Sequence, residues 1–304
     1  MRHTLCVCLL ALVAFAPLQA EDGATKSVRA VFWNIAWFPG GEPEASAPQA
    51  VDQIVKVVPA MAALAPDILG VCEVLNEQAI DISLYKTPGV TTQVCSAFLD
   101  EKTGLPTRQQ IGIASRLPAM SAWWEEWKPS KANPKRGFTF AAFQPVPGHT
   151  LLVYTVHLKS NRGDEKENFA MREESSRQLL DHVAAMEKAY AVTGKVSVII
   201  GGDFNTSLDD PKFTKEKSLI DLQKAGFVWC WEGIPFKDRV TLPSEPSKNP
   251  NYPPFPDTCF DHVFAKNVKL RSARVEVVEG KPSDHRPVVV ELDFPSPSPS
   301  GPTK

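Results

Sequence analysis

Acidic, amide and imidazole side chains stand at the ends of several short apolar segments of this chain. The segment VIIGGDFN places Asp203 and Asn205 at the end of one apolar run, and KPSDHRPVVVEL places Asp284 and His285 just before another. The other segments are VFWNIAW with Asn34, LGVCEV with Glu73, VYTVHLKS with His157, Lys159 and Ser160, and CFDHVFA with Asp261 and His262. Any one of them could be ordinary turn chemistry, but three carboxylates interrupt apolar contexts, where burial is costly without a partner.

This set of side chains suits one kind of chemistry. Carboxylates and carboxamides are the ligands of hard cations such as Mg²⁺. A histidine beside an aspartate is an orienting pair, in which the carboxylate fixes the tautomer and stabilises the imidazolium. An aspartate close to an asparagine can hold and deprotonate a water molecule. Together the set predicts in-line attack of water on a phosphoryl centre, without a serine nucleophile, because the chain has no GxSxG motif.

The elements that carry these side chains are mostly strands. Apolar runs rich in β-branched and aromatic residues recur along the chain and are bounded by turn residues. Helical patterns are expected over 51–64, with a kink or break at Pro59, over 164–190 and over 218–225. Strands therefore outnumber helices, which favours an α/β sandwich with helices packed outside its sheets.

Composition and charge set further limits. The chain has 304 residues, 43% of them hydrophobic, which suits one large globular domain. Its formal net charge of −2 gives no electrostatic reason to expect tight, non-specific nucleic-acid binding, although a bound metal ion would add positive charge at the site.

The N-terminus predicts export. Arg2 and His3 precede an apolar stretch over 5–16 that is too short to span a bilayer comfortably. We therefore expect a signal peptide over 1–20, one catalytic domain over 21–294 and a disordered Pro/Ser tail over 295–304. The mature protein would be periplasmic or secreted. A retained N-terminal anchor is the alternative.

Export also changes the interpretation of the cysteines. Loss of the signal would leave Cys72, Cys95, Cys230 and Cys259 in an oxidising compartment. We expect disulfides between Cys72 and Cys95 and between Cys230 and Cys259, because each pair flanks one connection. Buried free thiols are the alternative.

In this order, the segments WNIAW, CEV, VHLKS, GGDFN, FDHVF and SDHRP resemble the endonuclease/exonuclease/phosphatase superfamily, the fold of pancreatic deoxyribonuclease, exonuclease III, bacterial sphingomyelinase and inositol polyphosphate 5-phosphatases. The resemblance spans 28–294 and includes bacterial secreted nuclease members of the superfamily. It implies a four-layered α/β sandwich, in which two packed mixed β-sheets are flanked by helices, with the site along one rim of the sheets.

The resemblance also implies roles for individual residues. The expected metal site, for Mg²⁺ with Mn²⁺ or Ca²⁺ as alternatives, consists of Asn34, Glu73 and Asp284. The residues expected to act on water or phosphate are His157, Asp203, Asn205, Asp261 and His285. Among these, the Asp203 and Asn205 pair would activate the water and Asp261 would orient His285. Arg116, Arg136 and Lys159 are the residues expected to bind the substrate.

The substrate is left open by this resemblance. A secreted nuclease is favoured, because HLKS is similar to a segment of bacterial extracellular nucleases. A sphingomyelinase-type lipid phosphodiesterase is the runner-up, since Trp123, Trp124 and Trp127 of AWWEEW could enter a membrane interface. An inositol or sugar phosphate phosphatase and a degenerate binding module are the remaining alternatives. No protein partner is implied, and we expect a monomer.

Overall fold

The computed structural model describes residues 25–244 and 255–295. The expected signal peptide and residues 296–304 of the expected tail lie outside the described residues.

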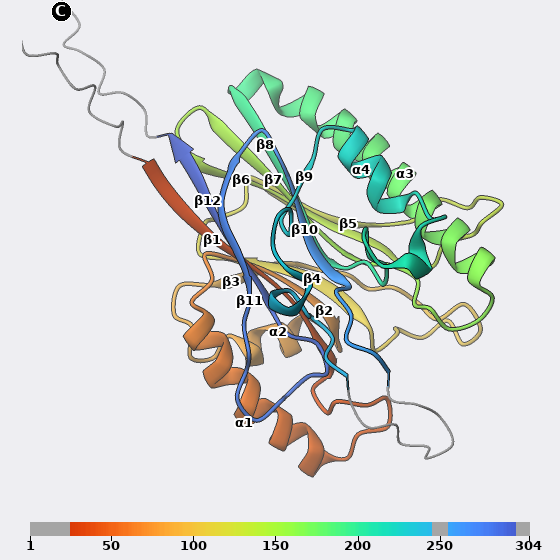
Figure 1. Ribbon diagram of the computed structural model, residues 1–304. Coiled ribbons are helices and arrows are strands. Elements are labelled where there is room, and N and C mark those ends of the chain that lie inside the picture. Colours follow the sequence, from red (N-terminus) through yellow and green to blue (C-terminus); the bar gives the residue numbers. More distant parts are fainter. Residues whose placement is uncertain (1–24, 245–254, 296–304) are drawn as a thin grey trace, which may run out of the picture.

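Two mixed six-stranded sheets pack face to face, with helices on their outer faces (Figure 1). The first sheet has the order β11-β12-β1-β2-β4-β3, with strands β1 Thr25–Phe38, β2 Ile68–Val74, β3 Thr91–Cys95, β4 Gln110–Ser115, β11 Lys269–Val275 and β12 Val288–Pro295. The second has the order β5-β6-β7-β8-β10-β9, with strands β5 Ser121–Glu126, β6 Gly137–Val146, β7 His149–His157, β8 Lys195–Asp203, β9 Val228–Trp229 and β10 Asp261–Lys266. The expected four-layered α/β sandwich is therefore confirmed.

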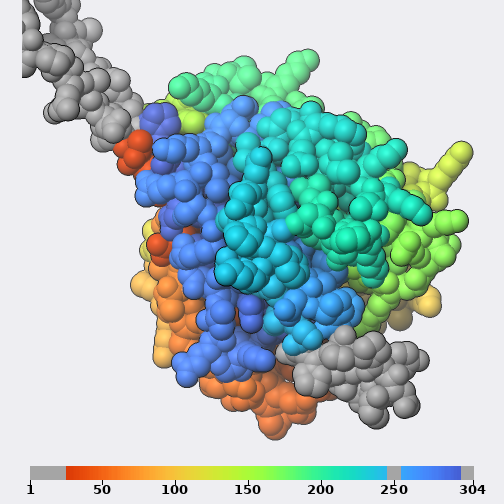
Figure 2. Space-filling view, in the orientation of Figure 1, coloured from red at the N-terminus to blue at the C-terminus, as the bar shows by residue number. Residues whose placement is uncertain are grey.

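The helices cover both outer faces. Helices α1 and α2 lie against the first sheet, and α3 and α4 lie against the second (Figure 1). Their bounds are α1 Ala47–Leu64, α2 Glu77–Ser83, α3 Glu165–Tyr190 and α4 Ser218–Lys224, with short 3₁₀ turns at Ala191–Thr193, Pro211–Phe213 and Phe236–Asp238. The space-filling view shows the C-terminal segments, in blue, between the N-terminal segments in orange and the middle of the chain in green (Figure 2). Both ends of the described chain thus contribute to one body.

The break expected at Pro59 is wrong, because α1 runs through that residue to Leu64. Proline removes the hydrogen bond that its own N–H would donate to the carbonyl of Val55. Pro59 and Val55 both lie on the exposed side of the helix, where water can serve that carbonyl instead.

The two glycines before Asp203 are required by close contacts with neighbouring strands, and not only by the turn that follows them. A Cβ on Gly201 would lie 2.5 Å from the ring of Phe32, which also meets Gly70 from the other sheet. Gly202 has φ +132°, and a Cβ there would lie 2.1 Å from the carbonyl oxygen of Val156. Gly201 therefore allows β8 to approach the first sheet closely, and Gly202 allows it to pass close to its neighbour β7 within the second sheet.

The two expected disulfides are absent, since all four cysteines of the described chain are free. Cys72 pairs in register with Ile111 and Cys95 with Gly112, so the two thiols lie on opposite faces of the first sheet. Cys230 and Cys259 are both buried thiols, and the Cys230 sulfur accepts the Val263 N–H at 3.2 Å.

The tryptophans of AWWEEW pack onto the protein itself. Trp123 stacks obliquely on Phe140 with ring centroids 4.3 Å apart, and Trp124 meets Phe98 edge-on at 5.4 Å. Trp127 is buried. In the part of the chain that the structure describes, no helix combines the length and apolar character needed to cross a bilayer.

Candidate active site

The strand ends bring the candidate side chains to one rim of the sandwich. In the second sheet, β7 and β8 are parallel, so His157 and Asp203 stand side by side at their carboxyl ends. Strand β10 runs antiparallel to β8, and its first residue, Asp261, pairs with Asp203. In the first sheet, parallel β1 and β2 carry Asn34 and Glu73 toward the same place.

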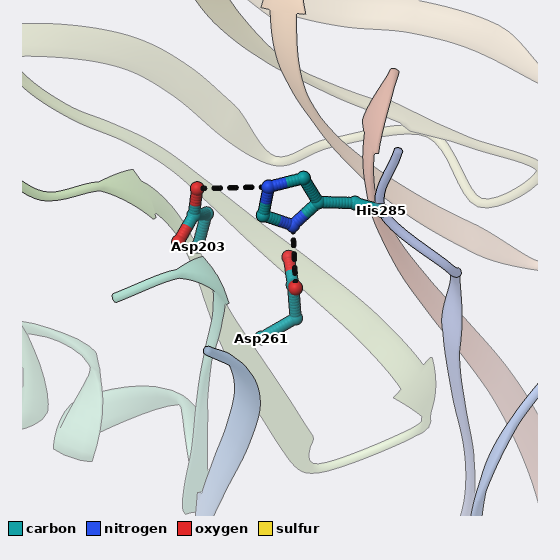
Figure 3. A group of neighbouring side chains, drawn as sticks. All are labelled: Asp203, Asp261 and His285. Atoms are coloured by element: carbon teal, nitrogen blue, oxygen red, sulfur yellow. Dashed lines mark hydrogen bonds and ion pairs between the residues drawn. The ribbon is translucent and has the colours of Figure 1, made fainter. Parts of the chain in front are cut away.

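His285 lies between two carboxylates (Figure 3). Its Nδ1 is 2.7 Å from Asp261 Oδ2, and its Nε2 is 3.8 Å from Asp203 Oδ2. All three side chains are at least nine-tenths buried. The His285 Nδ1–H donates to the Asp261 carboxylate, which fixes the orientation of the ring; when the ring is protonated, its Nε2–H faces Asp203 and the site.

Glu73, Asn34 and Asp203 form a second contact across the two sheets. The amide nitrogen of Asn34 is 3.1 Å from Glu73 Oε1 and 3.1 Å from Asp203 Oδ2. Glu73 has φ +59° and is 13% exposed at its side chain, which makes it the most accessible of these three carboxylate and amide groups. A non-glycine residue held at positive φ next to such a cluster is a common feature of functional sites.

Arg136 completes one wall of the site. It too has positive φ, and its guanidinium lies 2.9 Å from His157 Nδ1 and donates to the Leu158 carbonyl at 3.0 Å. His157 Nε2 lies 3.5 Å from Asp203 Oδ2 and 3.6 Å from Glu73 Oε1. His157 therefore bridges the guanidinium and the two carboxylates.

Asn205 faces the same carboxylate from the following loop. Its backbone N–H donates to Asp203 Oδ1 at 2.9 Å, its side-chain amide donates to the Leu158 carbonyl at 3.2 Å, and its φ is +54°. Asp203 and Asn205 are thus held next to each other, as a pair that positions one water would be.

Burial and neighbouring charges set the protonation of the site. Burial raises the pKa of Asp203 to about 7; the charges of Asp261 and Glu73 add to the rise and the His285 cation opposes it. The pKa of His285 is raised well above its usual value, because the attraction of Asp261 and Asp203 outweighs the effect of burial. The pKa of His157 is lowered well below its usual value by burial and by Arg136. His285 is therefore the cationic histidine of the site and His157 the neutral one.

A hard cation fits this site at Glu73. The negative charges of Glu73 and Asp261 contribute to the raised pKa of Asp203. A cation bound among these carboxylates would relieve that repulsion. Ligand atoms of Asp203, Asp261 and His285 also lie within 4.8 Å of one another. However, His285 is protonated and uses Nδ1 for Asp261, so it is a poor ligand. Glu73 is the better oxygen ligand, whereas the neighbouring Asn34 turns its amide nitrogen toward Glu73 and its oxygen toward the Ala36 N–H at 3.0 Å.

Three expected site residues stand elsewhere. Arg116 is wrong as a site residue, because β4 is antiparallel to β2 and ends at the opposite rim, where Arg116 contacts Asp67 and the Pro88 carbonyl. The Lys159 ammonium donates to the carbonyls of Ser160 and Arg162 rather than toward Asp203.

Asp284 is exposed and its carboxylate contacts Ser283, not Glu73 or Asn34. The Ser283 hydroxyl in turn donates to the Asn34 carbonyl at 2.7 Å. Asp284 therefore lies beside the expected metal site without touching its other members. His262 points away and is buried between the Trp229 indole and the Thr206 carbonyl.

Several supporting residues carried no clear signal in the sequence. The indole of Trp33 donates to the His285 carbonyl at 3.0 Å, and the indole of Trp231 donates to the Asp261 carbonyl at 3.0 Å. Asn161 donates to the Asn205 carbonyl at 2.8 Å. Trp33 adjoins Asn34 in WNIAW and could have been singled out there, whereas the other two lie outside every motif.

The chain resembles known proteins over nearly the whole described region. The sequence profile of the endonuclease/exonuclease/phosphatase family matches residues 31–285. D. rerio TDP2 complexed with single strand DNA product is 16% identical, with a TM-score of 0.62, 88% of this chain covered and 99% of that chain. An endonuclease/exonuclease/phosphatase from Beutenbergia cavernae is 20% identical, with a TM-score of 0.62 and coverage of 90% and 73%. The human Nocturnin catalytic domain with bound sulfate anion is 15% identical, with a TM-score of 0.61 and coverage of 89% and 96%. These structures share the fold. No curated protein matches the chain.

Proposed function

Because the chain belongs to the endonuclease/exonuclease/phosphatase family, whose members hydrolyse phosphoesters, we propose that it is an exported, Mg²⁺-dependent phosphodiesterase that cleaves nucleic acid. The observation that supports this most directly is the arrangement of His285 between Asp261 and Asp203, with Asn205 beside Asp203 (Figure 3). That arrangement places a cation and a carboxylate base within reach of one phosphoryl group.

Each side chain has one role in this proposal. Asp203 accepts the proton of the attacking water, and burial of its carboxylate makes it a stronger base than an exposed aspartate. Asn205 orients that water. The His285 imidazolium, held by Asp261, donates to a phosphoryl oxygen and stabilises the charge that develops there. Glu73 would hold Mg²⁺, with Asn34 beside it as a ligand if its amide oxygen turns from the Ala36 N–H toward the ion, and the ion would supply Lewis-acid stabilisation of the same charge.

Arg136 and His157 would support the other side of the phosphate. The Arg136 guanidinium is buried against His157 and the Leu158 carbonyl, so it is fixed in place before any substrate arrives. A fixed guanidinium next to neutral His157 leaves the positive charge free to meet a phosphate oxygen.

Nucleic acid is the substrate class we favour. The D. rerio TDP2 structure of the same fold holds a single strand DNA product, and the HLKS segment is similar to one in bacterial extracellular nucleases. The lipid alternative rested on the AWWEEW tryptophans, and these pack against Phe140 and Phe98. Because Trp123 and Trp124 already use part of their surface for packing, we favour nucleic acid over lipid.

The test is cleavage of supercoiled plasmid and of a labelled single-stranded oligonucleotide by the full chain with Mg²⁺. We expect cleavage that EDTA and Asp203→Ala both abolish, and that Asp181→Ala, which removes an exposed helix carboxylate, leaves unchanged. The contrary outcome is release of phosphocholine from sphingomyelin, or of phosphate from sugar phosphates, without cleavage of DNA. That result would support phosphoester hydrolysis and contradict nucleic acid as the substrate. Activity that survives EDTA would contradict the metal requirement.

A further inference from the structure

A buried ion pair lies behind the candidate site. Arg172 of α3 is 0% exposed, and its guanidinium donates to Glu216 Oε1 at 2.8 Å and to Oε2 at 2.6 Å. Taking two charges out of water is costly, and well-packed apolar residues are often at least as stabilising in such places. Stability alone therefore does not explain why this pair is here.

The remaining donors of Arg172 connect α3 to the loop that follows β7. One guanidinium nitrogen donates to the Lys159 carbonyl at 2.8 Å and to Asn161 Oδ1 at 3.1 Å. The Asn161 amide nitrogen then donates to the Asn205 carbonyl at 2.8 Å. Because the Asn161 side-chain oxygen accepts from Arg172, the side-chain nitrogen of Asn161 faces Asn205.

Glu216 reaches the same loop from the other side. Its Oε2 accepts the hydroxyl of Thr206, the residue after Asn205, at 3.0 Å. The two partners of one ion pair therefore hold two consecutive residues, Asn205 through Asn161 and Thr206 directly.

Asn205 needs this support. Its φ of +54° is a conformation that L-residues rarely adopt, and asparagine tolerates it better than most. Such a conformation persists only where surrounding contacts fix it. In that conformation the Asn205 N–H meets Asp203 Oδ1 at 2.9 Å.

We propose that the Arg172–Glu216 ion pair, acting through Asn161, is a positioning device that fixes Asn205 beside Asp203 in the geometry required to orient the attacking water. Arg172, Glu216 and Asn161 are positioning residues, because none of their contacts in the described chain is with Asp203 or His285. This inference rests on the proposed function, in which Asn205 orients the water.

The most specific variants alter Asn161, since Arg172→Ala would leave the Glu216 carboxylate buried without its partner. Asn161→Ala removes the bond to Asn205. Asn161→Asp keeps an acceptor for Arg172 but has no donor for the Asn205 carbonyl. We expect both variants to lower kcat about 10-fold, the effect of one lost positioning hydrogen bond, with KM unchanged within about twofold. Arg172→Lys, which keeps the charge but loses the planar fork, should lower kcat similarly.

A double-mutant cycle separates positioning from general damage. In an Asn205→Ala background, Asn161→Ala should cause no further loss of kcat, because its effect passes through Asn205. Gln93→Ala is the matched control, since it removes the hydrogen bond that the Gln93 side-chain oxygen accepts from the Ala119 N–H at the opposite rim, and it should leave kcat unchanged. Additive losses in the cycle, or full kcat in Asn161→Asp, would overturn the inference.

Hydrogen exchange provides a readout that does not depend on any substrate. Asn161→Ala should speed exchange of the Asn205 amide about 10-fold or more while leaving the amides of β8 unchanged. If the wild-type chain hydrolyses no phosphoester, the proposed function is wrong. The exchange measurement would still show whether Asn161 fixes the backbone at Asn205. Unchanged exchange at Asn205 would refute it.

Discussion

Replacing Asp261 by asparagine removes one charge and leaves at most a neutral hydrogen bond where a charge-assisted one stood. Asp261 Oδ2 is 2.7 Å from His285 Nδ1, and both side chains are buried. The other carboxylate oxygen, Oδ1, has no hydrogen-bond partner within the described residues. The side chain therefore has a single protein partner to lose, and the variant keeps its volume.

The size of the effect follows from that one bond. A hydrogen bond to a charged group contributes about 1.5–3 kcal/mol. If this energy stabilises the imidazolium, the pKa of His285 should fall by about 1–2 units from its raised value. If the same interaction stabilises the transition state, kcat at neutral pH should fall about 10- to 150-fold.

The assay is the pH dependence of kcat for Mg²⁺-dependent phosphodiester hydrolysis. His285 must be protonated to act, so activity is lost as pH rises through its pKa. Because the variant has the lower pKa, its alkaline loss should begin about 1–2 pH units below that of the wild type. Asp67→Asn, at the opposite rim where Asp67 accepts the Arg29 N–H, is the control and should change neither kcat nor the profile. An Asp261→Asn profile that coincides with the wild type would refute the pairing of Asp261 with His285.

Four further outcomes are expected. Burial lowers the pKa of His262 to about 4, so the free energy of unfolding should fall by about 3 kcal/mol as pH drops from about 6.5 to 4. Denaturant titrations of His262→Gln should lack this loss, and the same pH dependence in the variant and the wild type would contradict it. Glu73→Gln should weaken Mg²⁺ binding about 10- to 100-fold by calorimetry, and unchanged affinity would remove Glu73 from the metal site. Arg116→Ala should keep kcat/KM within about twofold, since its guanidinium lies at the opposite rim; a tenfold loss in the hydrolysis assay would argue against that placement. Gly201→Ala would place a Cβ 2.5 Å from the Phe32 ring and should cost about 1–3 kcal/mol in thermal unfolding, whereas an unaltered Tm would show that the two sheets can separate slightly.

Strand ends were the informative feature of the sequence. Parallel neighbours end at the same rim, so polar residues that close apolar runs were expected to meet, and the structure places Asn34 and Glu73 together on this basis. The contact between the two sheets, from Asn34 to Asp203, depends on how the sheets pack face to face. No local pattern contains that information.

Register and face explain the wrong expectations. Arg116 follows an apolar strand just as Asp203 does, but β4 is antiparallel to β2 and delivers it to the other rim. Cys72 and Cys95 flank one connection, yet the strand pairing turns them to opposite faces of a sheet. Both outcomes depend on which residues pair across neighbouring strands. A one-residue change of register would put Cys72 and Cys95 on the same face of the sheet. Asn161 was missed for a related reason, because its importance lies only in its contacts with Arg172 and Asn205.

The central claim is that a water held by Asp203 and Asn205 attacks phosphorus directly. The most direct measurement is a single turnover of a nitrophenyl phosphodiester with Mg²⁺ in ¹⁸O-labelled water, followed by mass spectrometry of both products. We expect one labelled oxygen in the phosphate monoester and none in the released nitrophenol. An unlabelled monoester, as formed when an enzyme carboxylate attacks phosphorus and water then cleaves the ester at its carbonyl carbon, or label in the nitrophenol would contradict it.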